Sequence, residues 1–75
     1  MPFQILRIEY DCAGNVAARQ TTKPVFEFDE DALALAEFDA CRAGDELEFD
    51  PQKNCWRTTT PTGGRLEFCV EEIKT

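Results

Sequence analysis

The 75-residue chain contains no histidine and no serine. The common pairing of a serine or cysteine nucleophile with an imidazole base is therefore impossible. The four glycines fit turns and a helix end, and none belongs to a phosphate-binding loop. Carboxylates are abundant, but nothing in their pattern buries them and raises a pKa towards neutrality. The sequence therefore predicts that the protein is not an enzyme.

Metal-binding and targeting signals are also missing. The chain has no CxxC pair for zinc and no complete EF-hand loop for calcium, so we expect neither a metal nor a cofactor. It has no apolar run long enough to span a membrane and no signal peptide at its start, so we expect a cytoplasmic protein. Because thiols stay reduced there, the cysteines are expected as buried free thiols rather than disulfides or zinc ligands: Cys12, Cys41, Cys55 and Cys69.

What the sequence has in excess is negative charge. Of the net charge of −7, residues 27–50 (EFDEDALALAEFDACRAGDELEFD) contribute ten of the fifteen carboxylates and only one cation, Arg42. This argues against direct binding to nucleic acid or anionic lipid, because both require a positive surface. It favours a basic partner. An acidic surface can also serve only to keep a protein soluble, and that alternative stays open.

The pattern predicts a single α+β domain, residues 1–75, with the element order β-β-α-β-β-β. Alternating apolar residues predict strands at 3–11, 17–28, 46–49, 55–60 and 65–73, with Pro24 at an edge or a bulge. Turn residues at 13–15, 50–54 and 61–64 should join neighbouring strands as hairpins, which makes the sheet largely antiparallel. The Ala- and Leu-rich helix should be capped by Asp29 or Asp31 and should end at Gly44.

A helical wheel places Ala34, Leu35, Phe38 and Cys41 on one arc, which we expect to face the sheet. The small-sided face with Leu33, Ala36 and Ala40 would then be exposed. One helix over one sheet face gives a two-layer domain whose other sheet face stays in solvent. The predicted core consists of Phe26, Phe28, Leu35, Phe38, Phe49, Trp56, Leu66 and Phe68.

The acids of ELEFD should share one direction. Glu46, Glu48 and Asp50 must point together if Leu47 and Phe49 point inward, with about 6.7 Å between successive acids. That spacing is compatible with the phosphates of DNA. The predicted partner-binding acids are this ladder, acids on neighbouring strands, and those at the helix start and in the following loop: Glu27, Asp29, Glu30, Asp31, Asp45, Glu46, Glu48, Asp50, Glu67 and Glu71.

A small, very acidic domain of this build, with its charge in EFDEDALALAEFDACRAGDELEFD and no catalytic set, resembles the phage-encoded anti-CRISPR proteins. The resemblance implies a non-catalytic inhibitor that acts as a DNA mimic in the host bacterial cytosol. Its implied partner is a basic nucleic-acid-binding surface of a CRISPR-Cas complex, such as a Cas subunit of a type I complex. Direct binding to nucleic acid or membrane is not expected.

A second hypothesis is a salt-insensitive protein-interaction module. It would use the Leu33/Ala36/Ala40 helix face or an edge strand of the sheet. Acids on the edge strands oppose self-pairing, whereas the Ala-rich helix face favours it, so we expect a monomer or a weak homodimer. Salt should weaken binding strongly under the first hypothesis and little under the second.

Overall fold

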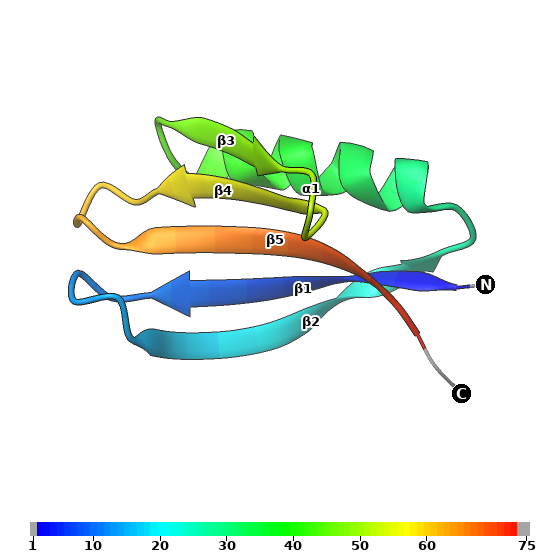
Figure 1. Ribbon diagram of the computed structural model, residues 1–75, viewed down its shortest axis with the longest axis horizontal. Helices are drawn as coiled ribbons and strands as arrows, with labels where there is room; N and C mark the ends of the chain where they lie inside the picture. The colour runs from blue at the N-terminus through cyan, green and yellow to red at the C-terminus, as the bar shows by residue number, and fades with distance from the viewer. Residues whose placement is uncertain (1, 74–75) are drawn as a thin grey trace.

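The computed structural model describes residues 2–73, except for the side chains of residues 22–24. It contains one helix and five strands in the predicted order (Figure 1). These elements are β1 (Phe3–Tyr10), β2 (Val16–Phe26), α1 (Asp29–Ala43), β3 (Leu47–Asp50), β4 (Cys55–Thr59) and β5 (Arg65–Glu72). The predicted α+β class, with one helix packed on one side of the sheet, is confirmed.

The five strands form one sheet in the order β2-β1-β5-β4-β3, and every neighbouring pair is antiparallel. The chain leaves β2 at one edge of the sheet and enters β3 at the other, so α1 has to cross the sheet between them (Figure 1). The register of β2 against β1 shifts between Phe3 and Ile5, opposite the stretch that contains Pro24. Pro24 therefore lies in an irregular part of an edge strand, as predicted for a residue without a backbone N–H.

The ends of the helix differ in detail from the prediction. Phe28 occupies the N-cap position and makes no side-chain cap hydrogen bond, so neither Asp29 nor Asp31 is the cap. Both lie in the first turn, where the helix dipole favours negative charge. At the other end Gly44 has extended φ and ψ angles of −161° and −178°. A Cβ there would lie 2.0 Å from the carbonyl oxygen of Thr59, so glycine is required by close approach to β4.

The side of the helix that faces the sheet was predicted wrongly. Ala32, Ala36 and Ala40 are fully buried, whereas Phe38 is 56% exposed. Large side chains from the sheet already fill the space between the layers, so only small helical residues allow the two layers to close on each other. The Leu33/Ala36/Ala40 face is thus part of the core and is not an exposed interaction surface.

The core also differs from the predicted set. Leu66 and Phe68 are buried as predicted, and Phe26, Leu35 and Trp56 pack at its border. Phe28 and Phe49, in contrast, are 64% and 37% exposed. Phe28 precedes the helix, and Phe49 lies on the edge strand β3, so both have neighbours on fewer sides. The buried cluster consists of Ile5, Ala32, Ala36, Ala40, Leu66, Phe68 and Val70.

The expectation of four buried free thiols is wrong. Cys55 and Cys69 form a disulfide between β4 and β5, while Cys12 and Cys41 are free and exposed. Cys55 and Cys69 are directly opposite in the register. The adjacent hydrogen bond from Val70 N–H to Asn54 O makes theirs a non-hydrogen-bonded pair, the type in which opposed side chains lie closest. Within residues 2–73, no helix is long and apolar enough to cross a membrane.

Candidate functional site

The acids of residues 27–50 occupy two regions of the molecule. Most follow α1: they lie just before it, in its first turn, along its exposed side, and in the loop after it. Only Glu48 and Asp50 lie within β3, on the sheet face that α1 does not cover. The helix extends well beyond β3 at its N-terminal end (Figure 1). The predicted acids therefore do not form one continuous sheet surface.

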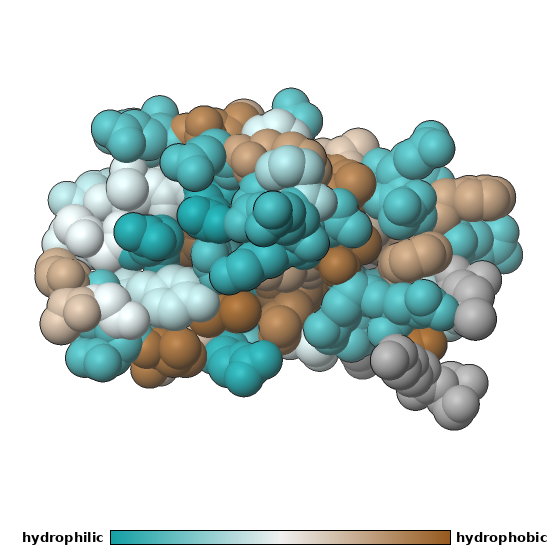
Figure 2. Space-filling view, viewed as in Figure 1, coloured by the Kyte–Doolittle hydropathy of each residue, from teal (hydrophilic) through white to brown (hydrophobic). Residues whose placement is uncertain are grey.

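The uncovered face of the sheet, the open face, is chemically mixed. In Figure 2, which looks onto this face, hydrophilic residues gather over β3, β4 and β5, and hydrophobic residues lie along β1. The register explains this pattern, because Leu6 of β1 is opposite Cys69, and Ile8 is opposite Glu67. A half-buried apolar strip thus runs beside the charged one. The open face is not a purely anionic surface.

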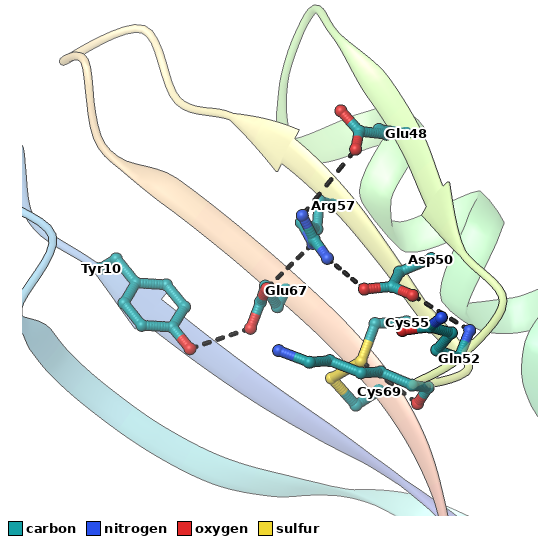
Figure 3. A network of polar contacts seen from close by, with 9 residues as sticks. Tyr10, Glu48, Asp50, Gln52, Cys55, Arg57, Glu67 and Cys69 are labelled. Atoms are coloured by element: carbon teal, nitrogen blue, oxygen red, sulfur yellow. Dashed lines mark hydrogen bonds and ion pairs between the residues drawn. A yellow bond between two sulfur atoms is a disulfide. The ribbon is translucent and has the colours of Figure 1, made fainter.

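Arg57 of β4 is the centre of the charged strip (Figure 3). Its guanidinium contacts Asp50 through Nη2, and its Nη1 lies 3.8 Å from Glu48 Oε1. On the other side its Nε lies 3.0 Å from Glu67 Oε2, close enough for an ion pair but without the angle of a hydrogen bond. Arg57 therefore forms ion pairs with carboxylates from both neighbouring strands, β3 and β5. Asp50 and Glu67 are held against their own sheet, and their charge is largely neutralised there.

Glu67 also accepts a hydrogen bond from the Tyr10 hydroxyl at 2.9 Å, which extends the network to β1. This hydrogen bond to the carboxylate raises the pKa of Tyr10 above its usual value, with burial and the negative charge of Glu67 acting in the same direction. Glu67 itself is only 7% exposed. It lies on the open face, as the strand alternation predicted, but beneath its two partners and out of reach of another protein.

The remaining predicted acids have different surroundings. Glu71 accepts a 2.6 Å hydrogen bond from the Gln4 side chain across β1 and β5. Glu46, just before β3, and Asp45 beside it are exposed. Among the described side chains, no ion pair involves any of the other predicted acids, and all of them are exposed: Glu27, Asp29, Glu30, Asp31, Asp45 and Glu46.

Sequence reasoning did not single out Arg57, Tyr10 or Gln4. Each acquires its role from strand register: Arg57 stands opposite both Glu48 and Glu67, and Gln4 stands opposite Glu71. The alternation of each strand assigns a side chain to a face, but it does not align one strand with the next. Residues 51–75 carry four cations against three acids, but this count does not single out Arg57.

The described residues offer no metal site, since no three histidine, cysteine, aspartate or glutamate side chains within 2–73 come close enough together. Comparison of the chain with protein-family models, curated proteins and solved structures gives no match. The function of the site is therefore inferred from its own geometry and charge.

Proposed function

We propose that this protein is a non-catalytic binding protein whose acidic surface docks on a basic, nucleic-acid-binding surface of another protein. One observation supports this most. Of the ten acids in residues 27–50, only Glu48 and Asp50 form ion pairs with described side chains. Of the other eight, seven are exposed along α1 and at its two ends, and Asp39 is half-buried. A surface built to hold phosphates attracts such a row of carboxylates.

The proposed contact surface therefore lies along α1, and not on the row of acids in β3 that the sequence predicted. Glu30 and Glu37 lie on the same side of α1, about 10 Å apart along its axis. Together with the acids at both helix ends, they cover a length comparable to several phosphates of one DNA strand. We propose that the protein acts in this way as a DNA mimic.

The proposed target is the DNA-binding surface of a CRISPR-Cas complex, through a Cas subunit of a type I complex. This choice follows from the resemblance in size, charge and build to phage-encoded anti-CRISPR proteins. The inhibitor would bind stoichiometrically and would prevent target DNA from docking. The proposed place of action is the cytosol of the host bacterium.

A competition experiment tests the proposal. A purified type I surveillance complex is mixed with labelled target DNA, and the protein is titrated in at about 50 mM and about 300 mM salt. We expect DNA to be displaced competitively at low salt and much less at high salt, because screening weakens contacts between exposed charges. Full DNA binding at a large excess of the protein would contradict the choice of target.

Two matched variants locate the surface. Glu30→Gln/Glu37→Gln removes two charges from the helix, and Glu9→Gln/Glu72→Gln removes two charges from strands. Both variants change the net charge equally. The helix variant should bind about tenfold more weakly, since each exposed charge pair contributes up to about 1 kcal/mol. Equal effects of the two variants would mean that net charge alone drives binding, and the helix surface would then be rejected.

The disulfide allows an independent check of the compartment. Proteins of the bacterial cytosol keep their thiols reduced, whereas disulfides persist in oxidising compartments. Trapping of free thiols in intact producing cells, followed by mass spectrometry, reports the state of Cys55 and Cys69. Reduced thiols in the cell would agree with action in the cytosol. A fully formed disulfide would argue for an oxidising compartment.

A further inference from the structure

The edge strand β3 has an unpaired side and an uncovered face. It is the last strand of the sheet and pairs only with β4, so alternate N–H and C=O groups point away from the sheet. Leu47 and Phe49 are opposite Thr58 and Trp56, on the side of the sheet that carries α1. The helix packs chiefly on β5 and β4 and leaves these two side chains 40% and 37% exposed.

The two faces of β3 differ in chemistry. On the helix side it presents Leu47 and Phe49, and the Phe49 ring contacts that of Trp56 at 4.8 Å between centroids. On the open side it presents Glu48, whose side chain is 75% exposed. Its Oε1 lies 3.8 Å from Arg57 Nη1, a long distance for an ion pair. Glu46, exposed directly before the strand, adds a second carboxylate. A strand laid beside β3 would therefore meet apolar groups on one face and negative charge on the other.

The opposite edge of the sheet has the reverse charge. β2 runs VAARQTTKPVF and contains two cations and no acid. Pairing of β3 with β3 of a second copy would place like charges opposite each other, which is unfavourable. Pairing with β2 of a second copy would satisfy the charges, but Ala18 and Gln20 of β2, which share a face, are poor neighbours for Leu47 and Phe49. The partner strand that fits β3 best is basic and comes from another protein.

We propose that β3 receives an extended segment of the partner as a sixth strand of the sheet. The segment alternates apolar and basic residues. Its apolar side chains lie beside Leu47 and Phe49, and its basic side chains lie beside Glu46 and Glu48. That the segment belongs to the same basic partner rests on the proposed function. Its basic character rests on the exposed carboxylates of Glu46 and Glu48, and the addition of a strand rests on the free edge of β3.

Peptides test this inference directly on the intact protein. The probe is a peptide of about ten residues that alternates valine and lysine, long enough to form a strand. Two control peptides are a valine–lysine peptide of the same composition with the two residues in separate blocks, and an alternating valine–glutamate peptide. Binding is followed by chemical shifts and amide exchange of the labelled protein. The alternating lysine peptide should perturb and protect β3, with little change in β2.

Three variants sharpen the result. Leu47→Thr, which keeps strand propensity, should weaken the lysine peptide about threefold through loss of one cross-strand apolar pair. Val16→Thr on the other edge strand is the matched control and should have no effect. Glu48→Lys should reverse the preference, so that the glutamate peptide binds better than the lysine peptide. This reversal cannot result from partial unfolding, which would weaken both peptides.

The outcomes separate this inference from the proposed function. Equal binding of the block peptide, perturbation confined to α1 or β2, or self-association of the protein through β3 would each overturn strand addition. Displacement of DNA from the CRISPR complex could still be observed in any of these cases. Conversely, protection of β3 by the alternating peptide supports strand addition even if the CRISPR complex is not the target.

Discussion

Arg57 and Glu67 stand directly opposite each other on β4 and β5, with Arg57 Nε 3.0 Å from Glu67 Oε2. Both are largely buried for charged residues: 22% and 10% of their side-chain surfaces remain exposed. The pair separates two groups of acids. Asp50 and Glu67 are held by Arg57 within the sheet, while most acids along α1 are exposed to solvent.

Replacing Arg57 should destabilise the fold. Arg57→Gln leaves Glu67 with little solvent and Asp50 without its cation, at a cost of about 2 kcal/mol. Arg65→Gln removes the same charge from an exposed residue of β5, two positions before Glu67. This variant should change stability by less than about 0.5 kcal/mol. Urea unfolding at neutral pH measures both values. Similar stability of the two variants would show that the network contributes little.

Tyr10 should ionise at unusually high pH. It is the single tyrosine, so the ultraviolet absorbance of phenolate follows it alone. The midpoint should lie above the usual 10.0, because the phenol donates to Glu67. The protonated form is favoured on folding, so this stabilisation is complete below the ordinary pKa and is lost as pH rises through the raised pKa. Glu67→Gln should lower the midpoint, and Glu71→Gln on the same strand face should leave it unchanged.

The four cysteines should differ in their reactivity: two are free thiols and two form a disulfide. The native protein should expose two thiols to a titrant, Cys12 and Cys41, and all four only after reduction in denaturant. Reducing the Cys55–Cys69 bond, which links residues 14 positions apart, should lower stability by about 3 kcal/mol if chain entropy dominates. Cys12→Ala/Cys41→Ala should keep both the bond and the stability. Titration of four thiols in the unreduced native protein would refute the disulfide.

The orientation of the helix can be tested with one substitution at two positions. Ala36→Leu places three extra carbon atoms in the filled space between helix and sheet, and should cost about 1–3 kcal/mol. Ala34→Leu on the exposed side should change stability by less than about 0.5 kcal/mol, because leucine and alanine are both good helix formers. Thermal or urea unfolding gives the comparison. The opposite ranking would mean that the helix is rotated as the wheel alone had predicted.

The local sequence pattern was sufficient to predict the helix and the five strands of this protein. The alternation of Leu66, Phe68 and Val70 with Glu67 and Cys69 assigned both faces of β5 correctly, and the turn residues placed the hairpins. These features depend on backbone periodicity and on glycine, proline and asparagine preferences, which act over a few residues. The shared direction of Glu48 and Asp50 followed in the same way. Whether the acids bind a partner stays a prediction.

Tertiary structure decided the rest, because it depends on groups that are distant in sequence. The rotation of α1 was set by the large side chains of the sheet, which leave room only for Ala32, Ala36 and Ala40 and place Phe38 outside. The disulfide and the surroundings of Arg57 were set by strand register, which aligns residues of separate strands. The amino-acid sequence by itself determines how much negative charge the chain carries and in which segment it lies. Packing decided which of those charges are neutralised and which face solvent.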